Sequence, residues 1–322
     1  MKCVVTGGSG FVGSFIVEEL VKRGNEVVIV DLVPPNYELP EEVKFNVGST
    51  LYPETMRSAF AGATEVYDVA GVLGTEELMS DNGKAIDVNI KGTFNCLDLA
   101  LVEGVKRFFY PTKPNEWLNT YSITKIAGEK FCEMYRRAFG LDVTILRWFN
   151  AYGPRQHLYP VRKAVPLFII QALYGLDIEV FGDGEQTVEM VYVEDMARIV
   201  VDATRSSLGM KAGKVLDLGS GQVMTVNHLC KEIIRIVNAH FRPKNNPSPS
   251  QIRHLPMRMG EPMRTHIQAE LADLRNHMHI PVFTDVEIGL IKTIEYYNNL
   301  PKVEVMRALQ YFQSLRQTEV LV

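Results

Sequence analysis

The stretch that decides the fold is Thr6-Gly7-Gly8-Ser9-Gly10-Phe11-Val12-Gly13, a glycine-rich turn between two apolar runs. The run before it, Lys2–Thr6, is typical of a buried strand. In the run after it, residues 10–23, apolar side chains recur at helical spacing with charged ones on the opposite face. Glu26–Asp31 is apolar again and predicts a second strand. Strand, turn, helix and strand in this order predict a parallel βαβ unit.

The turn also predicts a dinucleotide site. Glycines let a pyrophosphate approach the backbone, where the amides at a helix N-terminus face its negative charge. Asp31 ends the second strand, where a carboxylate can accept hydrogen bonds from ribose hydroxyls and repel a 2′-phosphate. An Asp at a strand end is also a common turn residue. We expect NAD rather than NADP, bound along Gly7, Gly10, Phe11, Val12, Gly13 and Asp31.

Further alternation of short β-rich runs with helical patterns predicts a Rossmann-type, doubly wound parallel sheet. Strands are expected at 65–69, 107–110 and 143–149, with helices at 86–103 and 121–139.

Beyond residue 153 the pattern breaks into turns and isolated elements, which predicts a smaller α/β substrate-binding lobe. We therefore expect an NAD-binding domain over residues 1–153, to which segments near 186–220 return. The substrate lobe is expected over most of 154–322.

Composition bounds the class of protein. The chain has 322 residues, of which 46% are hydrophobic and 22% charged, as in a globular protein large enough for two lobes. Its net charge of -4 offers nothing to attract nucleic acid. The four cysteines lie far apart, which suggests neither a metal site nor a disulfide framework. With no long apolar run, the sequence predicts a cytoplasmic protein without a metal or a membrane partner.

A second motif, Tyr121-Ser122-Ile123-Thr124-Lys125, opens the helical pattern at 121–139. The i, i+4 spacing puts the phenol of Tyr121 and the ammonium of Lys125 on one face. A phenol has an ordinary pKa of about 10, and an adjacent ammonium and a cationic nicotinamide both favour the phenolate. Such a pair can take a proton from an alcohol as hydride leaves. The spacing alone also arises by chance, with a core tyrosine and a surface lysine.

Together these motifs resemble the extended short-chain dehydrogenase/reductase superfamily, specifically its NAD-dependent nucleotide-sugar epimerases and dehydratases, over nearly the whole chain. Four more segments carry the resemblance: a helix motif, a segment that begins in the strand expected at 143–149, and two late loops. They are Asn89-Ile90-Lys91-Gly92-Thr93, Leu146-Arg147-Trp148-Phe149-Asn150-Ala151-Tyr152-Gly153-Pro154-Arg155-Gln156, Phe181-Gly182-Asp183-Gly184-Glu185-Gln186-Thr187 and Pro256-Met257-Arg258-Met259-Gly260-Glu261-Pro262.

The resemblance implies roles for single residues. Asn150 and Arg258 would contact the diphosphate of a nucleoside-diphosphate sugar. Ala70 would lie beside the cofactor, and Lys125 would also bind the cofactor ribose. Asn150 also fits a loop cap and Arg258 a surface charge. The resemblance further implies a homodimer through the helices at 86–103 and 121–139, although their apolar stripe also serves packing on the sheet.

The chain departs from the family after the fifth strand, where relatives carry a catalytic Ser or Thr hydroxyl. Alignment from that strand places Lys113, rather than Thr112, at the hydroxyl position. One residue matters because alternate strand residues face opposite ways. Lys113 could replace the hydroxyl as a hydrogen-bond donor, but its charge would be repelled by oxidised nicotinamide. We therefore expect Thr112 to be the donor and Lys113 to turn toward the substrate diphosphate or solvent.

Another departure is Thr187-Val188-Glu189, where many relatives place a phosphate-binding Arg. Phosphate contacts are then expected from Arg258, Arg155 or a less expected group such as Arg162. Glu76 is a candidate acid/base group on the sugar, although the sequence favours its being part of an acidic first helical turn behind an N-cap Thr75.

The expected function is NAD-dependent epimerisation of a nucleoside-diphosphate sugar, most simply at C4, by transient oxidation to a keto intermediate. Dehydration or decarboxylation of that intermediate is the alternative and needs a further acid/base group. A different class is a non-catalytic NAD-sensing protein, which the shortened loop before Tyr121 would allow. The intact Tyr121 and Lys125 argue against it, because a sensor has no need of the pair.

Overall fold

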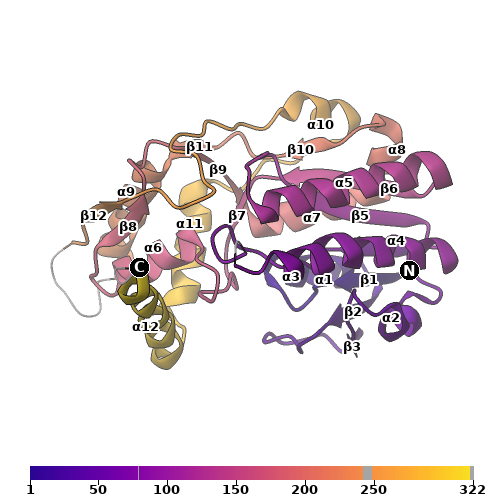
Figure 1. The fold of residues 1–322 in the computed structure, drawn as a ribbon, viewed down its shortest axis with the longest axis horizontal. Coiled ribbons are helices and arrows are strands. Elements are labelled where there is room, and N and C mark those ends of the chain that lie inside the picture. Colours follow the sequence, from indigo (N-terminus) through magenta and orange to yellow (C-terminus); the bar gives the residue numbers. More distant parts are fainter. Residues whose placement is uncertain (79, 242–248, 320–322) are drawn as a thin grey trace.

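The computed structural model describes residues 1–78, 80–241 and 249–319 (Figure 1). Its centre is a seven-stranded parallel sheet in the order β10-β6-β5-β4-β1-β2-β3. The predicted Rossmann-type α/β fold is confirmed. The strand order reverses between β1 and β4, which is where doubly wound sheets bind ligands. The strands are β1 (Lys2–Thr6), β2 (Glu26–Asp31), β3 (Val43–Val47), β4 (Glu65–Asp68), β5 (Arg107–Thr112), β6 (Asp142–Trp148) and β10 (Leu216–Leu218).

Helices cover both faces of this sheet, and alternate residues of each strand feed the two cores. On β1, Cys3 and Val5 pack with α1 (Phe11–Lys22) and α7 (Val193–Arg205), whereas Val4 packs with the helices of the other face. Those helices are α2 (Pro53–Phe60), α4 (Thr93–Val102) and α5 (Thr120–Phe139). The sheet is therefore buried on both faces, and its functional groups gather at the ends of its strands.

The helix expected at 86–103 is divided in the structure. It consists of α3 (Asn82–Ile86), the π-helical segment η1 (Asp87–Gly92) and α4. In η1 the buried Asn89 donates to the carbonyl of Val72 at 3.1 Å and accepts from its N–H at 2.9 Å. The wider helix turn directs this amide inward, which fixes the loop after β4.

The other lobe is built on two smaller sheets, β11-β9-β7 and β12-β8 (Figure 1). Its own hydrophobic core lies between these sheets and four helices. The strands are β7 (Asn150–Tyr152), β8 (Ile178–Phe181), β9 (Thr187–Tyr192), β11 (Val223–Thr225) and β12 (Ile252–Leu255). The helices are α6 (Ala164–Leu173), α9 (Val226–Ile236) with its π-helical end η2 (Val237–Phe241), α11 (Val286–Asn298) and α12 (Lys302–Glu319).

Two short helices lie near the edge of the large sheet: α8 (Leu208–Ala212) contacts β6, and α10 (Leu271–His277) contacts β10 (Figure 1). β10 follows α7 in the chain and pairs with β6, so a late segment completes the sheet that the first half of the chain begins. Among the described helices, none combines the length and the apolar character needed to cross a membrane.

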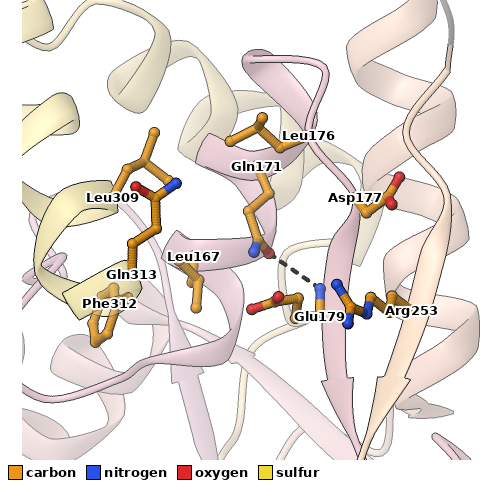
Figure 2. A pocket seen from close by; sticks show the side chains of 9 residues that line it. All are labelled: Leu167, Gln171, Leu176, Asp177, Glu179, Arg253, Leu309, Phe312 and Gln313. Carbon is orange, nitrogen blue, oxygen red and sulfur yellow. Dashed lines mark hydrogen bonds between the residues drawn. The ribbon is translucent and has the colours of Figure 1, made fainter. Parts of the chain in front are cut away.

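A small cavity of about 150 Å³ lies between α12 and the α6–β8 part of this lobe (Figure 2). Leu309 and Phe312 of α12 line it opposite Leu167 of α6. On its other wall, the side-chain carbonyl of Gln171 accepts a hydrogen bond from the Glu179 N–H at 3.3 Å. The α12 contact is therefore incompletely filled, and this cavity is distinct from the larger cleft described next.

Candidate active site

The turn between β1 and α1 has no room for side chains. A Cβ on Gly7, whose φ is 69°, would lie 2.8 Å from the Ala70 Cα, and one on Gly13 would overlap the Gly7 carbonyl oxygen. Gly10, the N-cap of α1, has no side chain to cap the helix, which leaves the first amides of α1 available to an anion. The turn, Ala70 and the start of α1 at Phe11 thus form the cradle that a dinucleotide pyrophosphate requires.

The Asp31 carboxylate lies beside this turn. One of its oxygens accepts from the Ser9 N–H at 3.1 Å and the other from the Leu32 N–H at 2.7 Å. The Tyr37 hydroxyl, from the following loop, donates to the Gly8 carbonyl at 2.8 Å and ties that loop to the turn. This arrangement places a fixed negative charge where an adenosine ribose would lie, so the residues present fit NAD.

Tyr121 and Lys125 stand in the first turns of α5. Asn119 caps this helix by accepting from the Ser122 N–H at 2.9 Å, and it also donates to the Gly260 carbonyl at 3.1 Å. Tyr121 faces the cleft between the lobes, and Lys125 is only 7% exposed beneath it. The cap therefore sets the phenol at the cleft and ties it to the late segment that carries Arg258.

Burial dominates the electrostatics of the pair. It raises the pKa of the Tyr121 phenol, and it lowers the pKa of the Lys125 ammonium to about 8, although the nearby Asp68 opposes the second shift. Both groups are thus pushed toward their neutral forms. A positive charge brought beside Tyr121 favours its phenolate, so proton transfer becomes easier when a cation binds there.

Asp68, at the end of β4, was not expected from the sequence. It is 1% exposed and accepts from the Thr6 hydroxyl at 2.6 Å, while its other carboxylate oxygen has no hydrogen-bond partner among the described residues. Burial raises its pKa, and the charge of Lys125 opposes this. The charge of the Asp68 carboxylate therefore stabilises the buried Lys125 ammonium.

The structure differs from the expectation for Thr112. The Thr112 side chain is 1% exposed and its hydroxyl points at the Lys125 carbonyl, 3.4 Å away, under α5. Lys113, the next residue, lines the cleft, and its Nζ lies 5.6 Å from the centre of the Tyr121 ring. Because β5 continues to Thr112, beyond the expected end at Tyr110, strand alternation turns Thr112 inward and Lys113 toward the cleft.

The cleft itself has a volume of about 310 Å³ and is lined from both lobes. Four cations line it: Lys113, Arg162, Lys163 and Arg258. It also holds four of the nine buried side-chain atoms that have no hydrogen-bond partner in the described part of the chain. These are the Glu77 Oε2, Trp148 Nε1, Gln186 Oε1 and Arg258 Nε atoms. Several buried polar atoms without hydrogen-bond partners in one cleft indicate that a polar ligand provides the missing hydrogen bonds.

The expected substrate contacts are only partly brought together. Asn150 and Arg258 line the cleft, and Arg258 donates to Glu261 at 2.5 Å. Arg155 is placed elsewhere, at a φ of 66°: it donates to both oxygens of Glu18 on α1, at 2.6 and 2.8 Å, and stacks on Phe15. Arg155 therefore pairs with Glu18 and does not line the cleft where a phosphate contact was expected.

Glu76 is likewise exposed, whereas its neighbour Glu77 lines the cleft and accepts from the Arg162 N–H at 3.1 Å. The sequence signal for Glu77 was the same turn that suggested Glu76. Lys163 was not singled out from the sequence at all; its signal was a basic pair directly before the apolar α6. Burial lowers its pKa to about 8.

A Rossmann sheet with a side-chain-free dinucleotide cradle, next to a Tyr–Lys pair at an interlobe cleft, defines an NAD-dependent enzyme. The chain belongs to the NAD dependent epimerase/dehydratase family, whose model matches residues 3–219.

Named relatives span several reactions. The chain is 29% identical to the UDP-N-acetyl-alpha-D-glucosaminuronate decarboxylase of Bacillus cytotoxicus, over 93% of this chain and 98% of the relative. It is 26% identical to the UDP-glucose 4-epimerase of Mycolicibacterium smegmatis, over 93% and 99%. Among solved structures, the UDP-glucose 4-epimerase of Thermotoga maritima with UDP-glucose is similar, with a TM-score of 0.78, 26% identity, and coverage of 92% and 98%.

Proposed function

We propose that this enzyme interconverts the C4 epimers of a nucleoside-diphosphate sugar. The observation that carries the proposal is that Tyr121, in the first turn of α5, opens onto a cleft that gathers four cations and four unpaired polar atoms. The relatives named above act on nucleotide sugars, which supports this substrate class for the cleft.

The cations divide the cleft into two ends. Arg162 and Arg258 lie over the same Phe181 ring, 4.9 and 5.1 Å from its centre, and form the end for the diphosphate. Val188 of β9 lines the cleft where many relatives place an arginine, so these residues take over its role. The sugar then extends past Asn150 toward Lys113 and Tyr121.

At the sugar end, the Tyr121 phenolate accepts the proton of the C4 hydroxyl and later returns it. Lys125 and the positive charge around it hold the phenol in its ionised form during this transfer. NAD, when bound in the cradle described above, supplies the carbon that accepts the C4 hydride and gives it back. Asp31 selects this cofactor by its charge.

Placement of the acidic residues favours epimerisation over elimination. A dehydratase needs a further acid/base group beside the sugar. Glu116 and Glu76 are both exposed in the structure. Dehydration is the second candidate because Glu77 lines the cleft with its Oε2 unpaired.

The test is turnover of UDP- and dTDP-hexoses in deuterated water with NAD present. A 4-epimer without carbon-bound deuterium is the expected product, because the same hydride returns. Loss of water with deuterium at C5 or C6 would replace the proposal by a dehydratase. Loss of CO₂ from a uronate would replace it by a decarboxylase. Full activity of Tyr121→Phe would contradict all three reactions, since each begins with the same proton transfer.

We further propose a division of labour between the lobes. Residues 1–153, with 186–220, would hold NAD, and most of 154–322 would hold the nucleotide. In support, α7 and β10 pack on the NAD-binding sheet.

The active form is proposed to be a cytoplasmic homodimer through α4 and α5. Supporting this are exposed apolar side chains on and beside these helices: Ile86, Val102, Ile123, Met134 and Phe139. Part of the stripe expected from the sequence is used inside the molecule, since Leu97 packs in the core. Sedimentation as a monomer at micromolar concentration would contradict the dimer.

A further inference from the structure

Lys113 is a cation at the sugar end of the cleft that the reaction above does not use. Its Nζ lies 5.6 Å from the centre of the Tyr121 ring. Across the residues that the structure describes, its ammonium makes no hydrogen bond and no ion pair. Glu261, the acid whose charge reaches Lys113, is itself bonded to Arg258 at 2.5 Å. The charge of Lys113 is therefore left without a direct partner.

The position of Lys113 identifies the part of the ligand that it faces. Its charge acts on Lys125, beneath Tyr121, and on Lys163, which lines the cleft just before α6. Lys113 thus lies beside the catalytic pair, which is where the sugar ring would sit. The diphosphate has Arg162 and Arg258, both over Phe181, so Lys113 is left for a group on the sugar.

The chemistry of that group follows from the charges. Lys113 is half-buried, and a ligand that fills the cleft displaces water from its ammonium, which is costly unless an anion or several acceptors compensate it. An amino sugar would add a cation near Lys113, Lys125 and Lys163, which like charges oppose. A neutral hydroxyl offers one acceptor but no charge. A carboxylate offers both charge and acceptors, and a sugar carries one as a uronic acid.

We infer that the substrate is a nucleoside-diphosphate hexuronic acid and that Lys113 binds its carboxylate. The inference rests on the proposed function for the direction in which the sugar lies. Lys113 is then the residue that separates acidic from neutral sugars.

This pairing also bears on what happens to the oxidised sugar. A 4-keto uronate loses CO₂ when the C5–C6 bond breaks and its electron pair moves toward the C4 carbonyl. The carboxylate charge disappears in that step. An ion pair with Lys113 stabilises the carboxylate more than the departing neutral CO₂, so it opposes the loss. Lys113 therefore favours retention of the carboxylate and return to the epimer.

The test measures binding, so that it needs no turnover. Titration calorimetry on the NAD-loaded Tyr121→Phe protein compares hexose and hexuronate members of the UDP, dTDP and GDP series. With at least one base, the uronate is expected to bind about 30-fold more tightly, as for a desolvated charge pair. Adding Lys113→Met should bring the two dissociation constants within about threefold of each other. Lys113→Arg should keep most of the preference, which shows that the charge and not a loss of folding is responsible.

Arg162→Met is the matched control, because it removes a cation that lies over Phe181 at the diphosphate end. This variant should weaken the binding of the hexose and the hexuronate nucleotides alike and leave the ratio of their dissociation constants unchanged. The inference is overturned if no uronate binds more tightly than its hexose. It is also overturned if Lys113→Met weakens both sugars equally, which would place Lys113 on a shared hydroxyl.

Failure of the proposed function would look different from failure of this inference. Binding of uronates through Lys113 without release of any 4-epimer would contradict epimerisation and leave the inference standing. Epimerisation confined to neutral hexoses would support the proposed function and contradict the inference about Lys113.

Discussion

The ammonium of Lys125 lies 3.9 Å from the centre of the Tyr110 ring, and the Tyr110 hydroxyl donates to the Lys125 carbonyl at 3.2 Å. One tyrosine of β5 thus holds both the side chain and the backbone of the lysine. A ring face offers partial compensation for a buried cation. Burial still lowers the pKa of Lys125 to about 8.

This lowered pKa predicts how stability changes with pH. Between about 8 in the fold and 10.5 in the unfolded chain, the unfolded state binds more protons, so the free energy of unfolding rises with pH. Lys125→Met cannot titrate there. The unfolding free energy of the wild type minus that of Lys125→Met should therefore increase by up to about 3 kcal/mol across this window. Urea denaturation of the cofactor-free proteins at several pH values measures it, and a constant difference would contradict the buried cation.

Thr112→Val separates a structural hydroxyl from a catalytic one. Because Thr112 points at the Lys125 carbonyl, its loss should lower the unfolding free energy by about 1 kcal/mol. It should change kcat by less than about threefold, whereas Tyr121→Phe should lower kcat by about 10²-fold or more. Steady-state kinetics with the substrate found above gives the comparison. A large kcat loss in Thr112→Val would restore Thr112 as the hydroxyl donor.

Asp31→Ala should narrow the preference for NAD over NADP. The carboxylate is fixed by the Ser9 and Leu32 amides, so it cannot move away from a 2′-phosphate. Removing one repulsive charge should shift the ratio of the two dissociation constants by about tenfold. Glu26→Ala, at the opposite end of β2, is the control and should leave the ratio unchanged. Equal affinity of the wild type for both cofactors would show that Asp31 is not the selector.

Gly13→Ala should damage the cofactor cradle. Its new methyl group would overlap the Gly7 carbonyl oxygen, which forces α1 away from the turn. We expect about tenfold or weaker NAD binding and a loss of about 1–3 kcal/mol in the unfolding free energy. Gly83→Ala, with open space around its Cβ position, should show neither effect. Calorimetric NAD titration and thermal unfolding check both variants, and unchanged NAD binding by Gly13→Ala would exclude the close packing of the turn.

Several features could be predicted from the sequence because each depends on neighbours in the chain. The strand, glycine turn and helix from Lys2 to Lys22 are local patterns, and β1, α1 and β2 appear within a residue or so of their expected bounds. The helix that carries Tyr121 and Lys125 was predicted for the same reason, since an i, i+4 pair shares a face wherever the helix forms.

Other features depend on register and distance, which only the tertiary structure decided. Whether Thr112 or Lys113 faces the cleft is set by where β5 ends, because each further strand residue reverses the side. Arg155 is drawn to Glu18, a residue far away in the sequence, by a backbone turn at positive φ. β10 joins the sheet by pairing with β6, and its short sequence carries no signal of that partner.

The sequence by itself therefore determined the Rossmann architecture, the cofactor cradle and the spacing of the Tyr–Lys pair, because backbone geometry and short-range periodicity specify them. Only the tertiary structure decided which charges meet in the cleft: Lys113, the adjacent pair Arg162 and Lys163, and Arg258 come from three places in the chain. Their convergence depends on how the lobes pack together, and packing is a property of the whole chain and of no single segment.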